Sequence, residues 1–218
     1  MNVGLLKWLL ILMCSLAPAT YLADITSPRS AFAQTIVEEW STVKVPPPPE
    51  LKRVTLDTKG TAFLVLDIQR QNCSPRPRCV TSVPRIQALL AQARARGVSV
   101  IYSLVPGSAV ADVLREVAPL GGEPSVTSGP DKFLGTDLEK ILKEKGITTV
   151  IVVGTAAHGA VIYTGSGAAL RGFKVIVPVD GMSADNTYAE QYTTWHLMNA
   201  PRVGPQVTLT RTDLIQFP

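Results

Sequence analysis

The stretch AFLVLD at residues 62–67 decides the fold class, because five consecutive apolar residues end there in a carboxylate. A run that is apolar at every position, rather than at every second one, is typical of a strand buried on both faces of a parallel sheet. Comparable runs recur at 98–104, 149–153, 174–179 and 206–210. We therefore expect five buried strands.

Segments with helical spacing separate these runs. Apolar residues recur every three to four positions over 83–96, and Gly97 follows as a C-terminal stop. Thr136 precedes Glu139 by three positions, which predicts a capping box with Thr136 as N-cap. Two further helices are expected at 158–170 and 188–198. This alternation predicts a three-layer α-β-α sandwich with a mainly parallel, Rossmann-like sheet and right-handed crossovers.

The first 33 residues are predicted to be a signal peptide. Lys7 precedes an apolar run at 8–12, and Ala-Phe-Ala at 31–33 is typical of a cleavage site after Ala33. A membrane anchor is the alternative, but the run is much shorter than the roughly 20 residues of a spanning helix. We expect a periplasmic or secreted protein with no membrane association after cleavage.

The cysteines agree with export. Cys14 lies in the leader, after a bulky methionine that disfavours lipid attachment. Cys73 and Cys79 remain, in the Pro-rich stretch CSPRPRC. In an oxidising compartment such a short loop can bring the Cα atoms within roughly 4.4–6.8 Å, which predicts a disulfide. A zinc site is disfavoured, because His158 and His196 lie far along the chain.

The composition predicts one globular domain. The 218-residue chain is 46% hydrophobic and 17% charged, enough for one buried core. Its formal net charge of +4, without a basic cluster, does not predict a nucleic-acid partner. Residues 34–60 are polar and contain the polyproline run Pro46–Pro49, so we interpret them as a stiff arm on a domain at 61–218. An assembly or scaffold role for the arm is an alternative.

The candidate site is expected at the carboxyl ends of the strands, where open α/β sheets bind ligands. Asp67 ends the first strand, Lys132 precedes a helix, and the segment 154–160 joins the third strand to its helix. Free amides and the positive end of the helix dipole at that segment favour an anion or a developing oxyanion. The residues expected to contact a small-molecule substrate are Gln69, Thr155, Ala156, His158 and Gly159.

Three stretches together resemble the signature of the isochorismatase-like superfamily, which includes the cysteine hydrolases. They are FLVLDIQ at 63–69, KFLGTDL at 132–138 and VVGTAAHGAV at 152–161, in the family's order and spacing. RGFKV at 171–175 fits the strand that follows in that family, so the resemblance covers residues 61–218.

The resemblance implies a role for each site residue. In the cysteine-hydrolase branch, residues matching Asp67 and Lys132 assist a cysteine at the position of Ala160. An alanine methyl cannot attack a substrate, so that covalent route is excluded. The isochorismatase branch has a small residue there and a histidine matching His158, and it cleaves a vinyl ether non-covalently. The chain leans toward that branch, with Asp67 as general acid or base and Lys132 tuning it or holding a substrate carboxylate.

The resemblance implies no cofactor and no metal. Nicotinamidases of the superfamily bind a metal through an aspartate and two histidines after the second strand, which YSLVPG at 102–107 does not contain. Two hypotheses remain: a non-covalent hydrolase of a small, anionic molecule, and a binding protein or pseudoenzyme that kept the pocket after losing its nucleophile. The family usually forms dimers or larger assemblies, which implies a homo-oligomer.

Overall fold

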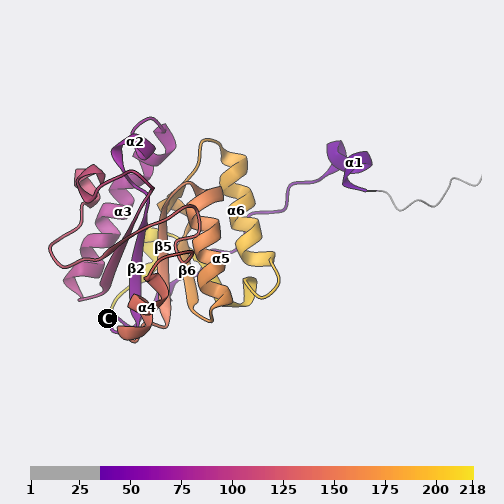
Figure 1. Cartoon of the computed structure of the whole chain (residues 1–218). Coiled ribbons are helices and arrows are strands. Elements are labelled where there is room, and N and C mark those ends of the chain that lie inside the picture. Colours follow the sequence, from indigo (N-terminus) through magenta and orange to yellow (C-terminus); the bar gives the residue numbers. More distant parts are fainter. Residues whose placement is uncertain (1–34) are drawn as a thin grey trace, which may run out of the picture. The chain divides into compact units, whose positions relative to one another are not determined.

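The computed structural model describes residues 35–218 (Figure 1). Along the chain it divides into two compact units, the first ending at Val45 and the second beginning at Pro46. The described part of the first unit holds α1 (Ile36–Glu39) and the 3-10 helix η1 (Trp40–Thr42), and none of its residues is buried. The predicted signal peptide and its cleavage site lie outside the described residues.

The second unit is built on a parallel sheet of seven strands. The order is β4-β3-β2-β5-β6-β8, with β7 paired to β5, and every pairing is parallel. The strands are β2 (Thr61–Leu66), β3 (Ser99–Leu104), β4 (Ser125–Thr127), β5 (Thr149–Thr155), β6 (Lys174–Pro178), β7 (Met182–Ser183) and β8 (Val207–Thr210). All of β2 is buried, as its unbroken apolar run predicts. The predicted mainly parallel sheet is confirmed.

Helices cover both faces of this sheet (Figure 1). Phe63 and Val65 of β2 share one core with α3, whereas Leu64 and Leu66 share the other with α4, α5 and α6. The helices are α2 (Arg70–Cys73), α3 (Pro77–Ala95), α4 (Leu138–Glu144), α5 (Ile162–Leu170) and α6 (Thr187–Asn199). The short 3-10 helices are η2 (Val110–Asp112), η3 (Arg115–Val117), η5 (Val179–Gly181), η6 (Gly204–Gln206) and η7 (Thr212–Leu214). This arrangement is the predicted three-layer sandwich.

Two helix starts differ from the prediction. α3 begins at Pro77 rather than at residue 83, because a proline fits the first turn of a helix, where its missing N–H leaves nothing unpaired. The capping box predicted at Thr136 is wrong: α4 begins at Leu138, with Asp137 as N-cap. The hydroxyl of Thr136 donates to the carbonyl of Lys132 at 2.5 Å, and Glu139 pairs with basic side chains instead.

The second compact unit includes residues 46–60 of the predicted arm. The amide of Lys52 donates to the carbonyl of Leu209 at 3.0 Å, and β1 (Val54–Thr55) pairs in parallel with β9 (Ile215–Gln216). These backbone bonds attach this half of the arm to the C-terminal part of the domain. No helix within residues 35–218 is long and apolar enough to cross a membrane.

Candidate functional site

The carboxyl ends of β3, β2, β5 and β7 lie side by side, because the strands are parallel and paired in register. Leu66 at the end of β2 pairs with Ser103 on one side and Gly154 on the other, and Thr155 pairs with Ser183. Gly154 allows the close approach of β5 to β2: its φ is +133°, and a Cβ would lie 2.0 Å from a carbonyl oxygen of β2. Asp67, one residue past β2, therefore starts its loop in the middle of this edge.

Asp67 and Lys132 form an ion pair at this edge. The Lys132 Nζ lies 2.8 Å from Asp67 Oδ2, and the side chains are 0% and 6% exposed. The Ser103 hydroxyl donates to Asp67 Oδ1 at 2.7 Å. Lys132 also donates to the carbonyl of Ser128 at 3.1 Å. The structure thus brings together the carboxylate and the ammonium that the sequence places in separate segments, and both carboxylate oxygens have partners.

Burial raises the pKa of Asp67 above the usual range of an aspartate, although Lys132 and Ser103 act to lower it. Desolvation disfavours the charged carboxylate more than the ammonium and the hydroxyl favour it. The carboxyl group therefore keeps its proton to a higher pH than an exposed aspartate would. A group of this kind suits proton donation as well as proton acceptance.

A hydroxyl on α5 anchors the segment that carries Lys132. Thr164 Oγ1 accepts from the amide of Lys132 and donates to the carbonyl of Pro130, both at 3.3 Å. Sequence reasoning missed Ser103 and Thr164 as parts of the site. The available signal was their position: each is a buried polar residue in an element that contributes mainly apolar side chains to the core.

The turn after β5 differs from the expected row of free amides. It forms one turn of π-helix, η4 (Ala157–Val161). The amides of Gly159 and Val161 both donate to the carbonyl of Ala156, at 2.9 and 3.3 Å. The amide of Gly159, which was expected to be free, therefore closes the turn together with that of Val161, because a wide π turn still has to satisfy its first carbonyl.

The other predicted site residues at the end of β5 and on the turn after it differ in how far their side chains are buried. Ala160 is 4% exposed, so its methyl group packs in the core beneath the turn. Thr155 is buried, and its hydroxyl donates to the carbonyl of Ser183 at 3.3 Å. His158 is exposed. Of these residues, only Thr155 has its side-chain polar group inside the protein, and that group already has a partner.

Gln69 is fully buried two residues past Asp67. Its Nε2 donates to the carbonyl of Ser103 at 3.2 Å, but its Oε1 has no partner. Within residues 35–218, the buried side-chain oxygens and nitrogens without a partner are Gln69 Oε1 and Ser183 Oγ. Both belong to the carboxyl edge of the sheet. An unpaired buried polar group costs about 1–3 kcal/mol, so both atoms have free capacity for a hydrogen bond at that edge.

The predicted disulfide is present between Cys73 and Cys79. The Cα atoms are 5.3 Å apart, and both residues are 0% exposed. The bond joins the end of α2 to the first turn of α3. Within residues 35–218, His, Cys, Asp and Glu side chains form no group of three that could hold a metal ion.

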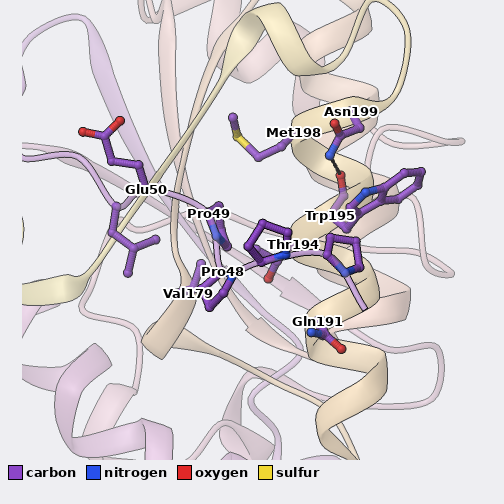
Figure 2. A pocket seen from close by; sticks show the side chains of 12 residues that line it. Pro48, Pro49, Glu50, Val179, Gln191, Thr194, Trp195, Met198 and Asn199 are labelled. Carbon is purple, nitrogen blue, oxygen red and sulfur yellow. Dashed lines mark hydrogen bonds between the residues drawn. The ribbon is translucent and has the colours of Figure 1, made fainter. Parts of the chain in front are cut away.

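A separate cavity of about 660 Å³ lies between residues 46–51 and α6 (Figure 2). Proline rings, Trp195 and Met198 line it, together with the polar side chains of Gln191 and Asn199. It contains none of the predicted site residues. It is therefore a surface feature distinct from the candidate site.

Comparisons with known proteins agree on one family. The family model described as "Isochorismatase domain" matches residues 61–211. N-carbamoylsarcosine amidase from Arthrobacter sp is 29% identical over 130 residues, covering 47% of this chain and 49% of that protein. The chain thus spans about half the length of this curated relative.

Solved structures show the same fold. A cysteine hydrolase from Pseudomonas syringae has a TM-score of 0.64 at 24% identity, covering 76% of this chain and 94% of that one. An isochorismatase family protein from Desulfovibrio vulgaris has a TM-score of 0.63 at 22% identity, covering 71% and 95%. N-carbamoylsarcosine amidase from Thermoplasma acidophilum has a TM-score of 0.59 at 24% identity, covering 70% and 96%.

Proposed function

The chain belongs to the isochorismatase family of hydrolases, and from this premise we propose that it is an exported hydrolase acting on a small, anionic molecule without a covalent intermediate. The buried Asp67–Lys132 pair at the carboxyl edge of the sheet carries the proposal. Ala160 stands where a nucleophile would be needed, and a methyl group cannot attack. Acid–base catalysis is the chemistry that the remaining side chains support.

Asp67 is the general acid or base in this proposal. In its protonated form it donates a proton to the substrate, and the carboxylate that results is stabilised by Lys132 and Ser103, at 2.8 and 2.7 Å. In its ionised form it accepts a proton from the attacking water. The raised pKa of Asp67 supports both directions, because general acid–base catalysis is most efficient when the pKa of the group lies near the working pH.

The site also supports a substrate class. The Lys132 ammonium and the amides of η4 that do not close the turn favour a negatively charged group. The unpaired Oε1 of Gln69 is a hydrogen-bond acceptor, so it favours a substrate with an N–H or O–H donor. A small anion that also carries such a donor fits both demands.

The test is a panel of anionic vinyl ethers, esters and amides with the purified mature chain. Wild-type protein is expected to turn over at least one of them, and Asp67→Asn to lower kcat by about 10²–10⁴-fold. Asp137→Asn is the matched control, because this carboxylate makes no capping bond in α4. Equal losses in both variants, or turnover that survives Asp67→Asn, would contradict the assignment of Asp67.

The buried methyl of Ala160 favours a second candidate, a binding protein or pseudoenzyme with a retained pocket. Ala160→Cys separates the two proposals. Amidase activity that appears in Ala160→Cys, while the wild-type protein turns over nothing in the panel, supports the pseudoenzyme. Wild-type turnover that Asp67→Asn abolishes supports the hydrolase.

Export is proposed from the leader and supported by the buried disulfide, a bond that persists in oxidising compartments. Fractionation of producing cells followed by N-terminal sequencing tests it. The expected result is a periplasmic or secreted chain that begins at Gln34. A full-length chain in the cytoplasm contradicts it.

We also propose a homo-oligomer. Tyr188, Tyr192 and Trp195 recur along one face of α6 and are 71%, 42% and 48% exposed. An uncharged aromatic face of this kind is typical of interface cores. Light scattering after size exclusion is expected to show a smaller species for Trp195→Asp than for wild type, with Leu120→Asp, an exposed apolar position outside α6 and the arm, as the control. Deleting residues 34–49 tests the alternative that the arm drives assembly.

A further inference from the structure

The backbone of Asp67 adopts a conformation that most residues avoid. Its φ is +54°, in the left-handed region that glycine and, to a lesser extent, asparagine and aspartate occupy. Such backbones persist only where the surroundings hold them, and they concentrate at functional sites. The direction of the Asp67 side chain depends on this backbone, so whatever holds the backbone also aims the carboxyl group.

One side chain bonds directly to this backbone. Asn72, on α2, donates from Nδ2 to the carbonyl oxygen of Asp67 at 2.9 Å. On the other side, the amide of Asp67 donates to the carbonyl of Ser103 at 3.3 Å. The peptide groups on both sides of the Asp67 Cα are therefore tied, one to β3 and one to α2.

The amide group of Asn72 is itself oriented. Arg76 Nη1 donates to Asn72 Oδ1, and it also donates to the carbonyl oxygen of Asn72 at 2.9 Å. Because Oδ1 faces the guanidinium, Nδ2 has to face Asp67. Arg76 is held in turn by an ion pair with Asp185, with Nε 2.8 Å from Oδ1.

The disulfide closes this arrangement. Cys73 follows Asn72 directly, and Arg76 lies inside the loop that the Cys73–Cys79 bond closes. A short covalent loop restricts the distance between α2 and the start of α3, so Asn72 and Arg76 stay within hydrogen-bond reach.

We propose that Asn72 is a positioning residue that sets the backbone of Asp67 and thereby aims its carboxyl group at Lys132 and Ser103. Arg76 and the disulfide keep Asn72 in place. The proposal rests on the proposed role of Asp67 as general acid or base. It adds that the catalytic efficiency of the Asp67 carboxyl group depends on Asn72, whose side chain touches neither the substrate nor that carboxyl group.

Asn72→Asp is the decisive variant. Aspartate has nearly the same shape and keeps an acceptor for Arg76, but it has no N–H for the Asp67 carbonyl. Asn72→Ala removes the donor without adding a charge. Gln71→Glu is the matched control: it makes the same change of charge one position earlier on α2, where the side chain is exposed and bonds to Ser108 rather than to Asp67.

The first readout is the pKa of Asp67, measured by NMR titration of carbon-13-labelled aspartate and assigned with Asp67→Asn. Both Asn72 variants are expected to raise this pKa, because the carboxyl group loses its alignment with Lys132 and Ser103, which lower it. Gln71→Glu is expected to leave it near the wild-type value. A residue needed only for stability would change the unfolding midpoint and leave the pKa of folded Asp67 in place.

The second readout is kinetic. On a panel substrate, the Asn72 variants are expected to lower kcat by about 10–100-fold with little change in KM, the effect of a misplaced catalytic group. Arg76→Gln is expected to shift the pKa of Asp67 in the same direction and to add little on top of Asn72→Asp. It also serves as the second variant if Asn72→Asp does not fold.

A pKa of Asp67 that stays at the wild-type value in both Asn72 variants, or that moves equally in Gln71→Glu, overturns the proposal. The titration needs no turnover. A wild-type protein without activity whose Asp67 pKa still responds to Asn72 therefore contradicts the hydrolase and leaves the positioning role standing.

Discussion

Lys132→Met is the variant that tests the buried ion pair most directly. Methionine keeps a long apolar stem in the 0% exposed position but removes the ammonium 2.8 Å from Asp67 Oδ2. The carboxylate keeps only the Ser103 hydroxyl as a partner. Removing one member of a buried pair leaves an uncompensated charge, which costs about 3–5 kcal/mol. That is a large share of the about 5–15 kcal/mol that holds a domain folded.

The pH dependence of this loss has a definite sign. Burial raises the pKa of Asp67 in the folded protein above its value in the unfolded chain. Between the two values the folded state binds more protons, so the stability that this group contributes is present at low pH and is lost as pH rises through the folded pKa. Lys132→Met removes a cation that lowers the pKa of Asp67. The pKa of Asp67 in the folded protein therefore rises further, and the pH range over which this stability is lost extends to higher pH. The free energy of unfolding that Lys132→Met loses is therefore largest at neutral pH and becomes smaller toward pH about 4.

Urea unfolding followed by circular dichroism at several pH values between 4 and 8 measures the effect. The double variant Lys132→Met with Asp67→Asn is expected to recover most of the loss, because it leaves no buried charge. Lys143→Met is the control, since Lys143 pairs with Glu139 at the exposed surface, and little change is expected there. A penalty that is the same at every pH, together with a double variant no more stable than Lys132→Met, would refute this account.

Three further predictions concern the framework of the site. Gly154→Ala is expected to lower the free energy of unfolding by more than about 3 kcal/mol or to prevent folding, because the new Cβ would lie 2.0 Å from a β2 carbonyl oxygen. Urea unfolding measures the loss, and Gly121→Ala, with open space around the added Cβ, is the control. Replacing Cys73 and Cys79 together by serine is expected to cost about 2 kcal/mol from loop entropy. By calorimetry that is a Tm lower by about 4–8 °C, and an unchanged Tm would contradict it. Tyr102→Phe is expected to cost about 1–3 kcal/mol, because the buried hydroxyl donates at 2.7 Å to the carbonyl of Val117 in η3, which would lose this partner. A loss of a few tenths of a kcal/mol in urea unfolding would contradict this.

Much of the fold followed from the sequence because burial on two faces leaves a local signature. The run at 62–66 contains no polar residue, which is typical of a strand covered by helices on both faces. The strands that sequence reasoning missed are too short to produce such a run: β1 (Val54–Thr55), β4 (Ser125–Thr127), β7 (Met182–Ser183) and β9 (Ile215–Gln216). They form because an existing edge or neighbour supplies their hydrogen bonds.

The candidate site divides in the same way. The position of Asp67 and the disulfide were predictable, because a residue that ends a buried strand lies at the ligand-binding edge of a parallel sheet and because a short Pro-rich loop brings two thiols together. Lys132 ends no strand, and its place beside Asp67 was expected from the family resemblance. The unpaired Oε1 of Gln69 was not predictable, since whether a buried amide finds a partner depends on what faces it.

The sequence alone was enough to predict a feature when its physical cause acts between residues that are neighbours along the chain, as in a buried strand or a short covalent loop. It did not suffice for Ser103, which reaches Asp67 from β3, or for Asn72, whose amide bonds to the Asp67 carbonyl only because the chain turns back over that residue. Hydrogen bonds reach about 3 Å and depend on direction, so these partners become visible only when the strands and helices have packed.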